Sequence, residues 1–180
     1  MPCSNAAQSP GNCYFYPMIH LLLVDDHIVV TEGIKLLLHD IGDILPVAEA
    51  RNGVQALEAL SKTKIDVAIM DIEMPEMDGV KCTGLIQQQY PDIKVVAISI
   101  YADYPHVQAM IKAGAKGYLL KNCGKQELEQ CIRKVHAGGT FFSDDLTIRL
   151  IIIALIVVYV AFIIFLRDSV RFSGGYSISE

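Results

Sequence analysis

The stretch Ile19–His27, which reads IHLLLVDDH, decides the fold of this chain. Its first part, Ile19–Val24, is an apolar run with the length of one strand, which is typical of a strand buried on both faces. Two adjacent carboxylates, Asp25 and Asp26, follow immediately, and a segment of helical periodicity comes next. A strand buried on both faces needs helices on both sides of its sheet, so the stretch predicts an α/β fold with parallel strands.

The pattern of an apolar run followed by a helical segment repeats along the chain from Met18 to Gly138. The further predicted strands are Ile44–Ala50, Val67–Asp71, Val95–Ser99 and Gly117–Leu120. Apolar side chains at helical spacing follow each strand, and the short helix after the second strand is expected to be marked by Val54, Leu57 and Leu60. Five strand–helix units with right-handed crossovers therefore account for one parallel sheet and both of its covering layers.

The composition excludes some classes of function. The chain has 180 residues, of which 52% are hydrophobic and 19% charged, and its formal net charge is −5. A protein that binds nucleic acid over a general surface needs a basic face, and this balance argues against one. The five cysteines show no CxxC pair and no Cys/His spacing typical of zinc, so we expect free thiols in a reducing compartment.

Polar side chains stand at the carboxyl ends of four predicted strands. Asp25 and Asp26 follow the first strand, Asp71 ends the third, Ser99 ends the fourth and Lys121 follows the fifth. Each has an ordinary explanation when taken alone, such as a helix cap for an aspartate or a solvated position for the lysine. Ligands of open parallel sheets bind at this edge, so the joint placement of these residues predicts a site.

Three carboxylates at one edge repel one another, and a hard divalent cation removes that repulsion. Mg²⁺ suits such a site because it needs few protein oxygens and keeps waters and a phosphate oxygen as its other ligands. A shielded carboxylate can then attack phosphorus as a nucleophile, while Lys121 and Ser99 bind the phosphoryl oxygens. The pattern therefore predicts the transfer of a phosphoryl group to an aspartate.

Four segments carry a resemblance to a known family: LLLVDDH (21–27), IMDIEMPEMDGV (69–80), VVAIS (95–99) and AGAKGYLLK (113–121). In this order they resemble the signature segments of the response-regulator receiver domain of two-component systems. The first segment and HAGGTFFSDDL (136–146) further resemble the NarL/LuxR-type group, which normally adds a helix-turn-helix output domain. The resemblance implies a flavodoxin-like (βα)5 three-layer sandwich whose five-stranded parallel sheet has the order 2-1-3-4-5.

The resemblance implies roles for the matching positions of the acidic edge. Asp71 is the phosphoacceptor, and Lys121 contacts the phosphoryl group that it receives. Asp25 and Asp26 hold Mg²⁺ together with Asp71, and the backbone carbonyl of Glu73 is a further ligand of the metal. The chemistry expected from the residues leaves open which aspartate accepts the phosphoryl group, and the resemblance implies that it is Asp71.

The resemblance also implies a conformational switch. Ser99 contacts the phosphoryl group, and the aromatic ring of Tyr118 changes its packing when Ser99 moves. The surface that responds is formed by the fourth helix, the fifth strand and the fifth helix. Glu73 and Tyr101 flank the site and are expected to tune the lifetime of the phosphoryl group.

The function implied is that of a response regulator in phosphorelay signal transduction, and at family level in transcription regulation. A sensor histidine kinase is the expected donor of the phosphoryl group, and a homodimer through the receiver is a second expected contact. Such a protein is regulatory and not an enzyme, since self-phosphorylation and autodephosphorylation are its only reactions.

Two other functions compete with this one. A phosphatase of the haloacid-dehalogenase type also uses a nucleophilic aspartate and Mg²⁺, but it needs a DxD pair at the end of its first strand. Here that strand ends in the adjacent pair Asp25–Asp26, and Asp71 ends the third strand. The other alternative is a receiver that only dimerises and is never phosphorylated, which labelling with acetyl phosphate would exclude.

The predicted receiver domain, residues 18–138, lies between segments of different composition. Residues 1–17 are polar and are expected to be a disordered extension, and residues 139–149 are expected to be a linker. Residues 150–166, LIIIALIVVYVAFIIFL, contain no charge, glycine or proline. A helix of that length spans about 26 Å, close to the roughly 30 Å of a bilayer core, so a C-terminal transmembrane helix is predicted, followed by a tail at 167–180.

Three explanations of this hydrophobic helix stay open. In the first it anchors the protein in the cytoplasmic membrane, with the receiver in the cytoplasm, where the kinase and its ATP are. In the second the chain is a truncated or frameshifted NarL-type transcriptional regulator that has lost its output domain, and in the third the segment is a soluble core or dimer element. Only 34 residues follow Leu146, with three arginines and no lysine, so DNA binding by this chain is not expected.

Overall fold

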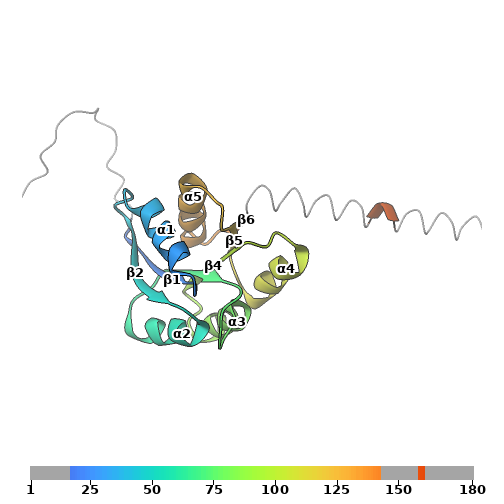
Figure 1. The fold of residues 1–180 in the computed structure, drawn as a ribbon, viewed down its shortest axis with the longest axis horizontal. Coiled ribbons are helices and arrows are strands. Elements are labelled where there is room, and N and C mark those ends of the chain that lie inside the picture. Colours follow the sequence, from blue (N-terminus) through green and yellow to red (C-terminus); the bar gives the residue numbers. More distant parts are fainter. Residues whose placement is uncertain (1–16, 143–157, 161–180) are drawn as a thin grey trace, which may run out of the picture.

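The computed structural model describes residues 17–142 and 158–160, and strands and helices alternate along the first of these ranges (Figure 1). The strands are β1 (Ile19–Val24), β2 (Ile44–Ala50), β3 (Val67–Asp71), β4 (Lys94–Ser99), β5 (Gly117–Leu120) and β6 (Phe141–Phe142). The helices are α1 (Ile28–Leu38), α2 (Gly53–Lys62), α3 (Gly79–Gln89), α4 (Tyr104–Ala113) and α5 (Lys125–His136). The first five strands agree with the predicted ones to within one residue.

All the strands run parallel in one sheet of order β2-β1-β3-β4-β5-β6. Helices α1 and α5 cover one face of this sheet, and α2, α3 and α4 cover the other (Figure 1). The predicted flavodoxin-like class, the three layers and the strand order 2-1-3-4-5 are therefore confirmed. The order makes β1 and β3 neighbours, so their carboxyl ends lie side by side.

The sheet has one strand more than was predicted. Phe141 and Phe142 pair with Gly117 and Tyr118 of β5, and the Phe141 N–H donates to the carbonyl of Lys116 at 2.9 Å. These phenylalanines fall in the predicted linker, residues 139–149, which therefore begins with structure that belongs to the sheet. A two-residue strand is too short to show alternation or an apolar run, which is why the pattern gave no signal there.

Alternate residues of β1 enter two separate apolar cores. Leu21 and Leu23 pack with the residues under α1 and α5, whereas Leu22 and Val24 pack with those under α2, α3 and α4. All four are at most 1% exposed. Burying one such side chain stabilises the fold by about 2 kcal/mol, so the unbroken apolar run of β1 follows from its position between two helix layers.

The buried face of α2 differs from the predicted one. Leu60 is buried and Leu57 partly buried as expected, but Val54 is 47% exposed. Ala56, which is fully buried, and Gly53 take the inner positions instead. The prediction followed large apolar side chains, whereas this helix approaches the sheet closely through small ones.

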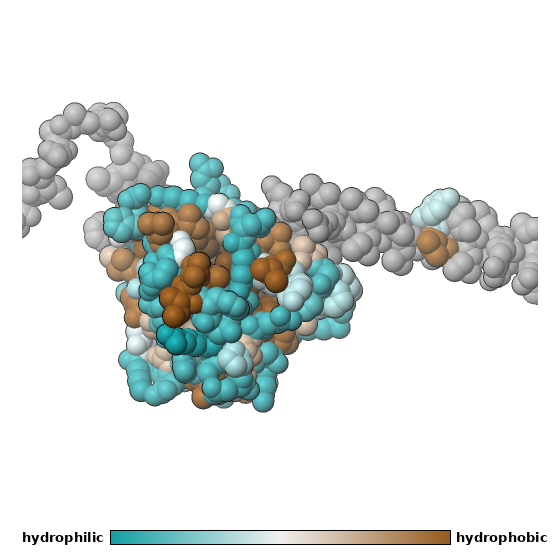
Figure 2. Space-filling model, in the orientation of Figure 1, coloured by the Kyte–Doolittle hydropathy of each residue, from teal (hydrophilic) through white to brown (hydrophobic). Residues whose placement is uncertain are grey.

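Helix α1 exposes apolar side chains as well as burying them. Ile28, Val29 and Leu36 are exposed, by 85% for Val29 and 77% for Leu36. Figure 2 shows brown apolar surface over the region that α1 occupies in Figure 1. Its inner face, with Ile34 and Leu38, still packs on the sheet as the periodicity predicts.

The predicted transmembrane helix, residues 150–166, lies outside the described residues except for Val158–Val160, which are helical. The predicted extension before Pro17 and the predicted tail at 167–180 lie outside them as well. Within the described ranges, no helix is both long enough and apolar enough to cross a membrane. The membrane anchor therefore stays a prediction from the sequence.

Candidate functional site

The parallel strands bring the polar side chains predicted from the sequence to one edge of the sheet. Asp71 and Ser99 are the last residues of β3 and β4, while Asp25 and Lys121 follow the last residues of β1 and β5. Backbone hydrogen bonds continue the pairing up to this edge: the Lys121 N–H donates to the carbonyl of Ser99 at 2.8 Å, and the Asp25 N–H donates to that of Ala50 at 3.1 Å. The sheet thus fixes the backbone position from which each of these side chains extends.

Lys121 joins the two most buried carboxylates of this edge. Its Nζ lies 2.7 Å from Asp25 Oδ2 and 2.8 Å from Asp71 Oδ2, and the two aspartate side chains are only 2% and 6% exposed. The other oxygens are held by the backbone, since Asp25 Oδ1 accepts from the His27 N–H and Asp71 Oδ1 accepts from the Ile72 N–H. One ammonium group therefore serves two buried carboxylates.

The protein stabilises the charge of Lys121 better than the charge of Asp71. Burial raises the pKa of Asp71, and the charge of Asp25 raises it further, although the contact with Lys121 acts in the opposite direction. Burial by itself would lower the pKa of Lys121, but its contacts with Asp25 and Asp71 outweigh burial and raise the pKa. Lys121 thus stays protonated, and the negative charge of Asp71 is incompletely compensated by the protein, as is typical of functional sites.

Asp26 and His27 extend the acidic group. His27 Nδ1 lies 2.8 Å from Asp26 Oδ1 and 3.2 Å from Asp25 Oδ1. One ligand atom from each of Asp25, Asp26, His27 and Asp71 lies within 4.8 Å of the other three. A role for His27 was not predicted, because its contact depends on a side-chain conformation that no spacing rule gives.

The donor set of this cluster fits a hard divalent cation. Two buried oxygens, Asp25 Oδ2 and Asp26 Oδ1, accept no well-directed hydrogen bond, although Lys121 and His27 nitrogens lie near them. A carboxylate oxygen has more than one lone pair, so these contacts leave both oxygens able to accept a further ligand. Mg²⁺ is bound by carboxylate oxygens of this kind, and Asp25, Asp26 and Asp71 are the side chains that would hold it.

The cluster borders a cavity of about 410 Å³. Two further residues predicted for the site, Ser99 and Glu73, line the same cavity. The Ser99 hydroxyl oxygen accepts from the Tyr101 N–H at 3.1 Å, and the Glu73 carboxylate accepts from the Tyr101 hydroxyl at 3.2 Å. The structure therefore collects around one cavity the acidic, hydroxyl and ammonium groups that the sequence placed at separate strand ends.

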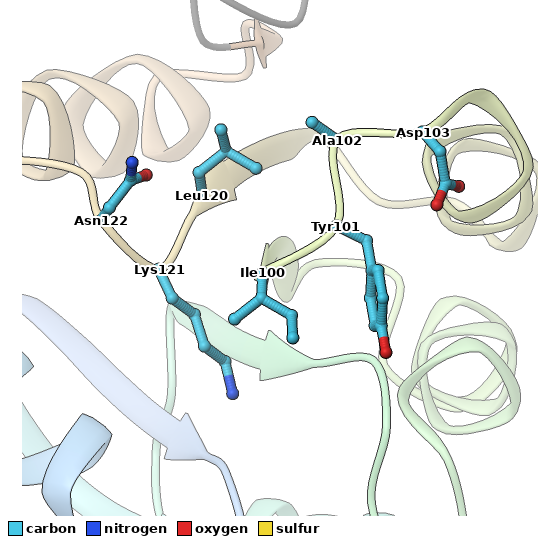
Figure 3. Close-up of a pocket in the computed structure, with 7 residues that line it drawn as sticks. All are labelled: Ile100, Tyr101, Ala102, Asp103, Leu120, Lys121 and Asn122. Carbon is cyan, nitrogen blue, oxygen red and sulfur yellow. The ribbon is translucent and has the colours of Figure 1, made fainter.

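A second cavity, of about 550 Å³, shares Ile100, Tyr101 and Lys121 with the first. In Figure 3 the side chain of Ile100 lies between those of Lys121 and Tyr101. Tyr118 is fully buried, which raises its pKa, and its hydroxyl donates to the Tyr101 carbonyl at 2.8 Å. The aromatic residue predicted to act as a switch is thus attached to the loop after β4.

The loop after Asp71 returns closely onto the strand. The Gly79 N–H donates to the carbonyl of Ile72 at 2.9 Å, and a Cβ atom on Gly79 would lie 1.9 Å from the carbonyl oxygen of Asp71. No side chain fits at that distance, so this position requires glycine. Glu76 in the same loop has a positive φ of 63°. The close approach of Gly79 therefore sets where this loop returns beside Asp71.

Comparison with protein families gives one assignment for most of the chain. Residues 21–133 match the model of the response regulator receiver domain. Among curated proteins, the response regulator GacA of Pseudomonas viridiflava is 38% identical over 133 residues, which are 74% of this chain and 62% of GacA. The response regulator UvrY of Escherichia coli K12 is 36% identical over 129 residues, which are 72% of this chain and 59% of UvrY. The chain thus spans about three-fifths of the length of these relatives.

Solved structures agree with that assignment. A two-component response regulator of the LuxR family from Aurantimonas sp. SI85-9A1 is 28% identical, with a TM-score of 0.68, and the likeness covers 72% of this chain and 93% of that one. The signal receiver domain of the putative response regulator NarL from Mycobacterium tuberculosis is also 28% identical, with a TM-score of 0.65 over 68% of this chain and 99% of that domain. The likeness to the second structure is confined to a receiver domain.

Proposed function

Because the chain belongs to the response-regulator receiver family, whose members are regulatory phosphoacceptors in signal transduction, we propose that Asp71 is its phosphoacceptor and that Mg²⁺ assists the transfer. The observation that carries this proposal is the position of Asp71. It is a buried carboxylate with a raised pKa, beside Lys121 and on the wall of a cavity with room for a phosphoryl group.

The donor we propose is a phosphohistidine of a sensor kinase. One oxygen of Asp71 forms a bond to phosphorus while the bond from phosphorus to the histidine nitrogen breaks, and the leaving imidazole keeps the electron pair and takes a proton from solvent. Lys121 is close enough to Asp71 to bind an oxygen of the transferred group, and Ser99 borders the same cavity. The protein thus contributes a nucleophile and fixed charges, which is the main part of catalysis in phosphoryl transfer.

The metal belongs to the same proposal. Asp25, Asp26 and Asp71 would hold Mg²⁺ through their side chains and Glu73 through its backbone carbonyl. When bound, the ion neutralises the carboxylates and the phosphoryl oxygens. The ligand atoms of Asp25, Asp26 and Asp71, which lie within 4.8 Å of one another, support this role. Removal of the metal should therefore stop the transfer without removing the fold.

We also propose that Ser99 and Tyr118 transmit the conformational effect of phosphorylation to the rest of the protein. A phosphoryl group brings a charge of about −1.5 to −2, by analogy with phosphorylated hydroxyl residues, and new acceptor oxygens. A move of Ser99 toward that group would break its hydrogen bond with the Tyr101 N–H, and Tyr118 is bonded to the same residue. The surface of α4, β5 and α5 would then change its packing and present a different face to a partner or a second copy.

The experiment that tests this function is labelling with acetyl phosphate and Mg²⁺, followed by intact mass. The wild-type protein should gain one phosphate, and Asp71→Asn should gain none. Asp66→Asn, a change of the same kind at the opposite edge of the sheet, is the matched control and should be labelled like the wild type. Chelation of Mg²⁺ should abolish the gain, and undiminished labelling of Asp71→Asn would refute the proposal.

A further inference from the structure

Each polar group of Tyr101 makes a hydrogen bond beside the proposed phosphoryl site. Its N–H donates to Ser99 Oγ, its carbonyl accepts from the Tyr118 hydroxyl, and its own hydroxyl donates to Glu73 Oε2. Glu73 follows β3 and Tyr101 follows β4, and both line the cavity that Asp71 borders. The bond between them therefore crosses from one loop to the other beside Asp71.

The ring of Tyr101 is fixed from a different element, helix α4. It stacks on the imidazole of His106, with 4.5 Å between the ring centroids and an angle of 9° between the planes. His106 Nδ1 in turn lies 2.6 Å from Asp103 Oδ1, which also accepts the His106 N–H at 3.2 Å. Asp103 is the N-cap of α4, so the start of this helix sets the orientation of the imidazole.

These four residues, Glu73, Tyr101, His106 and Asp103, form a continuous connection that we call the clasp. The charge of Glu73 raises the pKa of Tyr101, so the hydroxyl keeps its proton and remains a donor. Figure 3 shows the Tyr101 side chain extending from its loop alongside Ile100, with Asp103 at the start of α4. Asp103 and His106 do not line the cavity that contains Asp71, and Tyr101 is the residue of that cavity on which His106 stacks.

We propose that Asp103 and His106 are positioning residues that hold Tyr101 across the phosphoryl site and thereby slow hydrolysis of the phosphorylated Asp71. The proposal rests on the function proposed above. In the hydrolysis, a water oxygen forms a bond to phosphorus, the bond from phosphorus to the Asp71 oxygen breaks, and the carboxylate keeps the electron pair. The protons of the water pass to the phosphate and to solvent. A closed clasp limits the approach of that water, so the lifetime of the modification is set from α4.

The test measures the half-life of the phosphorylated protein after acetyl phosphate is removed. His106→Ala should shorten it by about 2-fold to 13-fold, since an aromatic stack contributes about 0.5–1.5 kcal/mol. His106→Phe keeps a ring against Tyr101 but loses the side-chain contact with Asp103, so it should restore part of the wild-type half-life. His39→Ala removes another histidine paired with a neighbouring aspartate, at the C-cap of α1 and outside the cavity of the site, and should leave the half-life unchanged.

A double substitution separates positioning from a general loss of structure. If His106 acts through Tyr101, His106→Ala should have no further effect in a Tyr101→Ala background, because the residue it positions is gone. An equal shortening in that background, or a wild-type half-life in His106→Ala, would overturn the proposal. A failure of the rescue by His106→Phe would overturn it as well.

Hydrogen exchange of the unmodified protein tests the clasp without any phosphoryl group. The segment 100–106 should exchange faster in His106→Ala than in the wild type, and His106→Phe should lie between the two. Unchanged exchange in His106→Ala would contradict the clasp, whatever the labelling shows. A wild-type protein that takes up no label would instead contradict the function proposed for Asp71, so the two failures are distinguishable.

Discussion

The two edges of the sheet use the same residue types in opposite ways. At the edge where the strands begin, Asp66 pairs with His20 at 2.8 Å, and Asp43 receives two hydrogen bonds from Arg133, at 2.6 and 2.9 Å. Asp66 thus has an imidazole partner and Asp43 a guanidinium partner, which also binds Glu129 at 2.9 Å. At the edge where the strands end, three aspartates share one lysine and one imidazole.

The pKa of Asp66, at the first of these edges, and the pKa of Asp71, at the second, are shifted in opposite directions. Burial tends to raise the pKa of Asp66, but the hydrogen bonds from His20 outweigh it and the pKa is lowered. Burial also raises the pKa of Asp71, and there the contact with Lys121 does not overcome it. A carboxylate that folding stabilises as an anion is a structural group, whereas one that folding leaves under-compensated is available to a cation or a phosphoryl group.

The largest effect we expect concerns the packing of the loop after Asp71, at the edge where the strands end. Gly79→Ala would put a Cβ atom 1.9 Å from the carbonyl oxygen of Asp71, so the backbone must move, at a cost of about 3 kcal/mol in the free energy of unfolding. Urea denaturation measures it. Gly84→Ala in the same helix is the control, because its Cβ would meet nothing within 4 Å and should stabilise the protein by about 0.5–1 kcal/mol. Equal effects of the two substitutions would mean that the loop is not tightly packed on β3.

The next effect is a change in the free energy of unfolding that has opposite signs at the two edges of the sheet. Asp66→Asn removes a charge that His20 stabilises and should lower the free energy of unfolding by about 1 kcal/mol. Asp71→Asn removes a buried charge that repels Asp25, so in the absence of Mg²⁺ it should raise the free energy of unfolding. The measurement is again urea denaturation at neutral pH, with chelator present. A loss of stability in Asp71→Asn would contradict the contrast between the edges.

The smallest effect we expect is in the pH dependence of the two differences in stability, between each of Asp71→Asn and Asp66→Asn and the wild type. The folded-state pKa of Asp71 lies above 3.8, its ordinary value, so its destabilising charge is lost as the pH falls through that pKa toward 3.8. The stability that Asp66 contributes is present above pH 3.8 and is lost only as the pH falls further, through its lowered pKa. The gap between Asp71→Asn and wild type should therefore close at a higher pH than the gap for Asp66→Asn. The reverse order in a pH series of unfolding curves would show that the directions given for the pKa shifts of Asp71 and Asp66 are wrong.

Most of the fold was predictable because it depends on local patterns. Runs such as Val67–Asp71 are apolar on both faces and short, and strict alternation with helical segments leaves few arrangements other than a parallel sheet. The pattern failed where burial does not require a large side chain, as at Ala56 of α2. It failed also at Phe141–Phe142, where pairing with β5 and not periodicity makes the strand.

The candidate site was predictable to the same degree. Topology alone places Asp25, Asp71, Ser99 and Lys121 at one edge, so the sequence anticipated which residues meet there. It did not indicate that His27 contacts two of the carboxylates or that His106 stacks on Tyr101. Those contacts depend on side-chain conformations and on how α4 starts, which neither spacing nor periodicity encodes.

The most direct measurement of the central claim is the position of the label. Borohydride reduces an aspartyl phosphate to homoserine, so reduction after treatment with acetyl phosphate and Mg²⁺ marks the modified residue for peptide sequencing. The account predicts homoserine at position 71. Homoserine at position 25 or 26, or an acid-stable phosphate on Ser99, would contradict it.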